Sequence, residues 1–226
     1  MQAFILAGGK GERLRPLTET IPKPLIKLNR LCLVEYWIEF FKKNNVKDLI
    51  ISVGHLGDKI IEHVGDGSKY GVKIRFIKED QPLGTAGPLK LAENMLQDTF
   101  YMLNCDNILE PDLKILQREI GDAEGILTGV SIEDVSRGGA LVTKDNYIES
   151  FAEKSQQGKG IISAGFYLLK KEVLKRITDG PMSIEKEVFP NIAKERKLKV
   201  HNYTNRWSDV GTIERLEHAR KLFPEA

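Results

Sequence analysis

Apolar residues in the first half of the chain alternate between short continuous runs and runs with helical spacing. Residues 2–7 form an apolar run that ends at a glycine, which is typical of a buried strand, whereas residues 33–45 have the spacing of an amphipathic helix. Because strands that alternate with helices form parallel sheets covered on both faces, the pattern predicts an α/β fold with ligands at the carboxyl ends of the strands. Further strands are expected at 46–53, 72–79 and 99–106, and further helices at 56–65 and 85–96.

The pattern changes after residue 125, where strand-like runs follow one another closely. This favours an antiparallel addition to the same sheet, because no linker rich in proline, serine or glycine separates the two parts. We therefore predict a single domain over residues 1–226. Strands are expected at 125–132, 139–144, 147–154 and 161–169, and helices at 183–195 and 212–223.

The charge balance gives no general attraction to polyanions. The chain has 34 lysines and arginines against 32 acidic residues, a net charge of +2, so neither nucleic acid nor an anionic membrane is an expected partner. Cys32 and Cys105 lie far apart in apolar surroundings, as reduced core thiols do. With no targeting or membrane-spanning segment in the sequence, we expect a cytoplasmic protein.

The histidines and the common nucleophile motifs offer no obvious catalytic centre. None of the four histidines has metal-ligand spacing to another or to a cysteine, so we expect structural or surface roles for them. No GxSxG, HExxH or Cys/His arrangement is present, and covalent catalysis has no sequence support. The histidines are His55, His63, His201 and His218.

The first strand runs into a glycine-rich loop that also carries five cations. Its sequence, LAGGKGERLRPLT followed by KPL, lacks the third glycine of a dinucleotide fingerprint and the Walker pattern of a P-loop. Pro16, Pro22 and Pro24 oppose a regular helix, which leaves a connection of about twenty residues, and loops of this length are usually functional. Glycine amides followed by cations predict an anion site; the alternative is a solvated surface loop.

This loop resembles the signature of the sugar-1-phosphate nucleotidylyltransferase family, in which threonine usually stands at the position of Glu12. QPLGTAGPLKLAE (81–93) and MSIEKEVFP (182–190) are similar to the segments of mannose-1-phosphate guanylyltransferases and of related heptose-1-phosphate enzymes. The resemblance runs from residue 3 to residue 212. It implies a three-layer, Rossmann-like nucleotide-diphospho-sugar transferase fold of the GT-A type, with a mixed, mostly parallel sheet.

The resemblance also implies how a nucleoside triphosphate is bound. Arg13 would neutralise its phosphates, Lys23 would reach the phosphate that is attacked, and these two are the expected catalytic residues. Thr85 is also placed to cap the next helix, and a plain turn with a cap is the alternative for this segment. The expected nucleotide-binding residues are Leu6, Ala7, Gly8, Gly9, Gly11, Gln81, Gly84, Thr85 and Asp106.

Two aspartates match the family's metal ligands. Asp106 ends an apolar strand and Asp209 lies about a hundred residues later, and each alone is more typical of a turn or cap. Together they imply Mg²⁺, since two phosphates of like charge need a divalent cation between them. The sequence after Asp106 is not the DxD of many glycosyltransferases, which disfavours that class.

For the sugar phosphate, the resemblance points to residues after the middle of the chain. Lys154 would bind the phosphate and Glu153 the sugar hydroxyls, unless the two form only a cross-strand ion pair. Ser163 stands where the family usually has asparagine. For the segment 182–190, which contains Glu185, the alternative is an amphipathic helix capped by Ser183. The expected residues are Glu153, Lys154, Ser163, Gly165 and Glu185.

The implied reaction joins a nucleoside triphosphate to a sugar 1-phosphate, giving a nucleoside-diphosphate sugar and pyrophosphate. GTP with mannose 1-phosphate or a manno-configured heptose 1-phosphate fits the motifs best. UTP or dTTP with glucose 1-phosphate, and CTP with a phosphocholine-like acceptor, stay open, as does a sensor or regulatory subunit on the same fold. Only the residues from 212 to 226 follow the last motif, so no β-helix module is expected. The oligomeric state is open, a homo-oligomer included.

Overall fold

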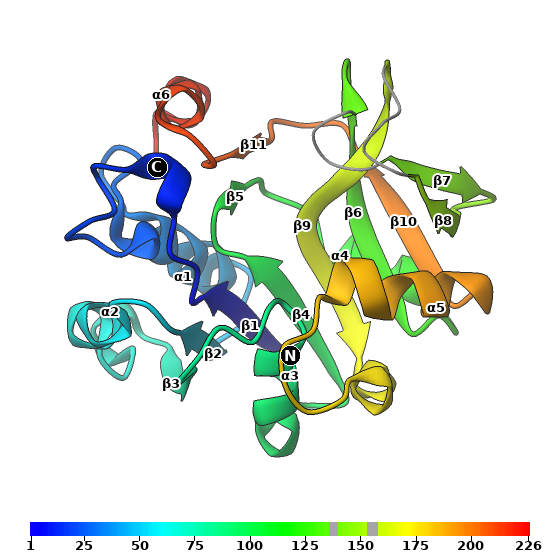
Figure 1. The fold of residues 1–226 in the computed structure, drawn as a ribbon, viewed down its shortest axis with the longest axis horizontal. Helices are drawn as coiled ribbons and strands as arrows, with labels where there is room; N and C mark the ends of the chain where they lie inside the picture. The colour runs from blue at the N-terminus through cyan, green and yellow to red at the C-terminus, as the bar shows by residue number, and fades with distance from the viewer. Residues whose placement is uncertain (136–139, 153–157) are drawn as a thin grey trace. The chain divides into compact units, whose positions relative to one another are not determined.

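A computed structural model describes residues 1–135, 140–152 and 158–226, and the chain divides into two compact units (Figure 1). The first contains Met1–Leu83, Met102–Glu110 and Arg206–Ala226, and the second contains Gly84–Tyr101 and Pro111–Asn205. Strand β4 (Thr99–Asn104) begins in the second unit and ends in the first.

The first unit is built on parallel strands in the order β3-β2-β1-β4. Strands β1 (Gln2–Ala7), β2 (Asp48–Val53) and β3 (Lys73–Lys78) pair in parallel, as strands joined through helices do. Two short strands, β5 (Asn107–Ile108) and β11 (Ser208–Asp209), pair antiparallel. The helices are α1 (Leu33–Lys43), α2 (Gly57–Val64) and α6 (Ile213–Leu222), with 3₁₀ turns η1 (Glu12–Leu14), η2 (Lys23–Leu25) and η3 (Ser68–Tyr70).

The second unit is a mixed sheet in the order β4-β9-β6-β10-β8-β7. β6 (Gly125–Ile132) is antiparallel to β9 (Gly160–Lys170) and parallel to β10 (Leu198–Tyr203). β8 (Tyr147–Phe151) is antiparallel to both β10 and β7 (Leu141–Lys144). The helical segments are α3 (Gly87–Leu91), η4 (Glu93–Met95), α4 (Leu113–Ile120), η6 (Lys171–Arg176), the π-helical turn η7 (Ile184–Val188) and α5 (Phe189–Lys194).

The mixed, mostly parallel sheet and the α/β alternation that the sequence predicts are confirmed. Two local predictions are wrong. The helix expected over 85–96 is two short segments, and Thr85 does not cap it, because Ala86 is the N-cap and no side chain bonds there. The helix expected over 183–195 has the expected cap, since the Ser183 hydroxyl accepts a hydrogen bond from Lys186 N–H. It is not one α-helix, however, but the π turn η7 followed by α5, which has Pro190 in its first turn.

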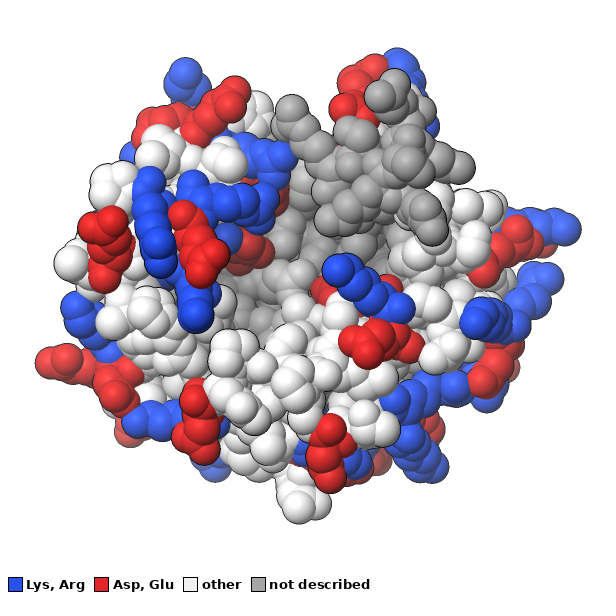
Figure 2. Space-filling view, in the orientation of Figure 1, with Lys and Arg blue, Asp and Glu red and all other residues white. Residues whose placement is uncertain are grey.

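The surface charge agrees with the small net charge. Lysines and arginines are interspersed with aspartates and glutamates over the face that Figure 2 shows. Within the described ranges, no helix has the length and apolar character needed to cross a bilayer.

A partly buried ion-pair network holds the second unit's sheet to its helical segments. Arg176 donates to both carboxylate oxygens of Glu124, each at 2.8 Å, and to both oxygens of Glu195 at 2.7 and 2.8 Å. These hydrogen bonds from Arg176, with those from Lys197, lower the pKa of Glu195 to about 2, and Arg176 also lowers that of Glu124. A lowered carboxylate pKa adds stability above the ordinary value of 4.5, and that stability is lost as the pH falls towards 2.

We therefore expect Arg176→Met to lower the free energy of unfolding at neutral pH by about 2 kcal/mol, since it leaves the Glu124 carboxylate without its bidentate partner. The difference from wild type should shrink as the pH falls from about 5 towards 2. Urea unfolding at several pH values measures it. Lys159→Met is the control, because the Lys159 side chain is 78% exposed and pairs with a similarly exposed Glu133 at 3.0 Å; an equal loss in both variants would contradict the prediction.

Candidate functional site

The loop after β1 is folded back by its own backbone contacts. Gly11 has a left-handed conformation (φ +64°), and its carbonyl accepts hydrogen bonds from Leu14 N–H and the Thr18 hydroxyl, both at 2.9 Å. Leu14 is fully buried and anchors the turn. A β-carbon at Gly11 would lie 3.1 Å from that of Lys23, so the glycine leaves room for the lysine side chain.

Lys23 brings the loop to the acidic residues that follow β4. Its ammonium group pairs with the Asp106 carboxylate, whose other oxygen accepts from the Asn107 side chain at 3.2 Å. The Lys23 side chain is only 13% exposed. One expected catalytic residue and one expected metal ligand therefore meet across 83 residues of sequence.

The second aspartate reaches the same place through the small ladder of β5 and β11. Asp209 pairs with Asn107, the residue after Asp106, and Val210 N–H donates to the Asp106 carbonyl at 2.7 Å. Asp209 thus lies opposite the residue that follows Asp106, and Asp106 itself lies in the turn before β5. Each carboxylate already has a cationic partner and still has oxygen lone pairs for further ligands.

Arg215 is a residue of this site that sequence reasoning missed. Its guanidinium pairs with the Asp209 carboxylate, and its backbone N–H donates to Thr212, the N-cap of α6. A basic residue in the first turn of a helix opposes the helix dipole, and that anomaly was the available signal. A β-carbon at Gly211 would lie 2.8 Å from Asp209 Oδ2 and 3.5 Å from the Arg13 guanidinium, so Arg13 also belongs to this cluster.

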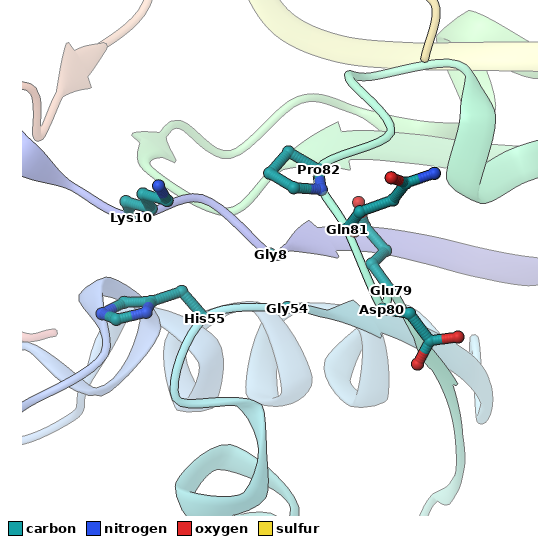
Figure 3. Close-up of a pocket in the computed structure, with 8 residues that line it drawn as sticks. All are labelled: Gly8, Lys10, Gly54, His55, Glu79, Asp80, Gln81 and Pro82. Atoms are coloured by element: carbon teal, nitrogen blue, oxygen red, sulfur yellow. The ribbon is translucent and has the colours of Figure 1, made fainter. Parts of the chain in front are cut away.

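A pocket of about 230 Å³ lies where the first three parallel strands end (Figure 3). Gly8 and Lys10 follow β1, Gly54 and His55 follow β2, and the residues from Glu79 to Pro82 follow β3. Leu6 and Ala7 form the end of β1, and a side chain at Gly9 would point into open space. The carboxyl ends of parallel strands are where such folds bind ligands, as the sequence predicts.

Backbone crowding at this pocket explains its glycines. A β-carbon at Gly54 would lie 2.8 Å from the Gly8 carbonyl oxygen, and one at Gly8 would lie 2.5 Å from Glu79 Oε1. Glu79 is half-buried and accepts hydrogen bonds from the Ser52 hydroxyl and from Leu83 N–H. Gln81, the residue expected here, lines the same pocket but is exposed.

The remaining predicted residues lie in the second unit, where a chain of hydrogen bonds connects them. The Thr85 hydroxyl donates to Glu185 at 2.5 Å and accepts from Ile184 N–H at 2.9 Å. Tyr167, which the sequence analysis did not select, donates to the other Glu185 oxygen at 3.2 Å and accepts from the Ser163 hydroxyl at 3.2 Å.

Two glycines complete this chain of contacts. Gly165 N–H donates to the Ser163 hydroxyl at 3.2 Å. Gly84 has a positive φ of +73°, and a β-carbon there would lie 2.4 Å from the Met182 carbonyl oxygen. Gly84 therefore has to be a glycine at this point. Glu153 and Lys154 lie outside the described residues.

Relatives of known name match almost the whole chain. Mannose-1-phosphate guanyltransferase of Saccharomyces cerevisiae is 38% identical over 221 residues, and that of Yarrowia lipolytica is 39% identical over 220 residues. Both alignments cover 93% of this chain, which spans 61% of the length of these relatives.

Solved structures are similar over their full length. HddC from Yersinia pseudotuberculosis, in a complex with GMP-PN, is 30% identical with a TM-score of 0.84, covering 98% of this chain and 99% of that one. A putative glucose-1-phosphate thymidylyltransferase from Bacillus anthracis has a TM-score of 0.91 at 24% identity, covering 100% of this chain and 96% of the other, and shows the Rossmann-like fold alone.

The family model described as nucleotidyl transferase matches residues 2–225. This match agrees with the resemblance carried by the glycine-rich loop and extends it over nearly the whole chain. The chain belongs to the nucleotidyl transferase family.

Proposed function

We propose that this chain is a sugar-1-phosphate nucleotidylyltransferase that forms a nucleoside-diphosphate sugar and pyrophosphate, and that residues 1–226 act as one catalytic domain in the cytoplasm. The observation that carries the proposal is the convergence of loop cations with two aspartates from distant segments. Lys23 meets Asp106, Arg215 meets Asp209, and Arg13 lies beside Gly211. The names of the guanyltransferase relatives support the same reaction.

The reaction needs positioning and charge neutralisation more than a protein nucleophile. An oxygen of the sugar 1-phosphate, already ionised at neutral pH, attacks the α-phosphorus; that bond forms as the bond from the α-phosphorus to the bridging oxygen of pyrophosphate breaks. Backbone amides of the glycine loop cradle the triphosphate, and Arg13 and Lys23 neutralise its charge. Asp106 positions the Lys23 ammonium group before the nucleotide binds, so the phosphate oxygens contact a cation that is already in the site.

The two aspartates fit a hard divalent cation, and we propose Mg²⁺. Asp209 lies in β11 opposite Asn107, and Asp106 is the residue just before β5. Both are oxygen donors, and each carboxylate has lone pairs beyond those used by Lys23 or Arg215. Asp106 and Asp209 would hold the ion, which supplies charge screening between the two phosphate groups. Lys23 and Arg215 keep both carboxylates oriented before the substrates arrive.

For the sugar phosphate we propose the second unit's hydrogen-bonded set of Ser163, Gly165 and Glu185. Glu185 accepts from Thr85 and Tyr167 and is therefore fixed in place. Glu153 and Lys154 stay in the proposal as the sequence assigned them. Mannose 1-phosphate or a manno-configured heptose 1-phosphate is the proposed acceptor, with glucose 1-phosphate as the alternative.

For the nucleotide we propose GTP, because the strand-end pocket presents a carboxylate. Guanine offers two adjacent donors, N1–H and the N2 amino group, which match the two oxygens of one carboxylate, whereas uracil and thymine offer a single N–H between two carbonyl oxygens. Glu79 is held by Ser52 and Leu83 and lies against Gly8, at the pocket wall. The HddC complex with GMP-PN supports the same base.

The proposed reaction is tested by pyrophosphate release with GTP, UTP, dTTP, CTP and ATP, each paired with mannose 1-phosphate, glucose 1-phosphate, a heptose 1-phosphate and phosphocholine. We expect release with GTP and a manno-configured sugar phosphate in the presence of Mg²⁺. Release only from CTP with phosphocholine would replace the proposed substrates. Silence across the panel from folded protein that still binds a nucleotide would favour a sensor.

Asp106→Asn should reduce turnover by roughly a hundredfold or more while circular dichroism stays unchanged, because the amide removes a ligand charge and the partner of Lys23. Asp58→Asn is the matched control, since Asp58 is an exposed residue of the same unit. Full activity of Asp106→Asn with Mg²⁺ would refute the assignment of this aspartate.

Glu79→Gln should lower kcat/KM for GTP by at least about tenfold and change kcat/KM for UTP much less, because the amide presents one donor and one acceptor to guanine's two donors. Asp80→Asn is the control, as it removes the same charge from an exposed residue of the same pocket. Equal losses with both nucleotides, or in both variants, would mean that Glu79 does not read the base.

A further inference from the structure

Three side chains outside the phosphate-binding cluster come together where α1 begins. Cys32 is the N-cap of α1, Glu35 lies in its first turn, and His63 lies near the end of α2. One ligand atom from each, a thiol sulfur, a carboxylate oxygen and an imidazole nitrogen, lies within 4.8 Å of the other two. Sequence spacing does not reveal this group, because His63 lies 31 residues from Cys32 and the two meet only in the folded chain.

The spacing of these atoms is close to that of a tetrahedral metal site. Bonds of about 2.0–2.3 Å to zinc place neighbouring ligand atoms roughly 3.3–3.8 Å apart. The observed separations lie on either side of this range: 2.9 Å from His63 Nε2 to Glu35 Oε1, and 3.9 Å from His63 Nε2 to Cys32 Sγ. The third separation, from Cys32 Sγ to the Glu35 carboxylate, is at most 4.8 Å.

The site is closed on one side and open on the other. Cys32 is 1% exposed and the Glu35 side chain 16%, whereas the His63 side chain is 39% exposed. A cation therefore has an entry path beside the imidazole, and water can complete the coordination there.

Surrounding groups keep the carboxylate oriented. Cys32 N–H donates a hydrogen bond to Glu35 Oε2 at 2.9 Å. The Tyr70 hydroxyl, on η3, donates to Glu35 Oε1 at 3.1 Å. Such outer partners are what fix the ligands of protein metal sites.

We propose that Cys32, Glu35 and His63 form a binding site for a zinc-class divalent cation, with water as the fourth ligand, which ties the start of α1 to α2. One thiolate, one imidazole and one carboxylate suit zinc, whereas Mg²⁺ prefers the all-oxygen set of Asp106 and Asp209. The cation is structural in this proposal, because it joins two helices of the first unit (Figure 1). The proposal is independent of the reaction proposed above.

Cobalt(II) is the probe, since it occupies zinc sites and only a thiolate ligand gives it a strong near-ultraviolet charge-transfer band. A bound cation converts the Cys32 thiol to a thiolate, so the band reports a cation at this site. Titration of the metal-free protein should produce this band, saturate at a single equivalent, and be reversed by Zn²⁺. Cobalt bound by Asp106 and Asp209 gives no such band, so the two sites are distinguished.

Cys32→Ser should abolish the band, and Cys105→Ala is its matched control, because Cys105 is the other free, buried cysteine. His63→Ala, at a partly exposed position that tolerates truncation, should weaken Zn²⁺ binding by roughly tenfold or more in competition with a chelating dye. A wild-type protein without the band, a band that survives Cys32→Ser, or unchanged Zn²⁺ affinity in His63→Ala would overturn the proposal.

Discussion

The pairing of two very short strands, β5 and β11, is the constraint on which the proposed phosphate-binding cluster of Arg13, Lys23, Asp106, Asp209 and Arg215 depends. It places Asp209 opposite Asn107, next to Asp106, although about a hundred residues of the second unit lie between them in sequence. Two residues per strand give little stability by themselves. Helix α1 supplies the rest, because the buried Trp37 indole donates to the Asn107 carbonyl at 3.1 Å and the Tyr36 hydroxyl donates to the Leu109 carbonyl at 3.1 Å. Buried aromatic residues of α1 thus fix the backbone that carries the first aspartate.

In the cluster that this pairing assembles, each aspartate has one cationic partner. Lys23 and Arg215 each neutralise one aspartate, and these ion pairs hold both cations in the cluster. Incoming phosphate oxygens offer the cations a second anionic partner, and a divalent cation does the same for the carboxylates. Binding can then exchange partners with little rearrangement of side chains, which is the electrostatic preorganisation that phosphoryl-transfer sites need.

The sequence predicted the fold well, because local patterns carry that information. Runs of apolar residues determine which segments are strands, and the loop's glycines and cations led to the proposed anion site before any contact was known. Arg215 and Tyr167 were missed because each is defined by a partner that only tertiary structure supplies: Asp209 for the first, Ser163 and Glu185 for the second. Thr85 was assigned to the wrong partner for the same reason, since its hydroxyl contacts Glu185, a hundred residues away, and not the helix that follows it.

Glu79 and His63 show two ways in which sequence spacing fails to identify the residues of a site: Glu79 is close in sequence to a residue that was selected, and His63 is far from its partner. Glu79 lies two residues before Gln81, and both line the strand-end pocket. Because β3 ends at Lys78, the Glu79 side chain lies against Gly8 and Ser52 and is half-buried, whereas Gln81 is exposed. Burial of a loop residue depends on where the strand ends, to within one residue, and apolar patterns do not fix strand ends that well. His63 is far from Cys32 in sequence and meets it because α2 packs beside the start of α1. Spacing rules describe metal sites built from one local segment. They cannot detect a site such as the one proposed for Cys32, Glu35 and His63, whose ligands come from two helices. The three-dimensional arrangement of donor atoms has to be known before such chemistry can be inferred.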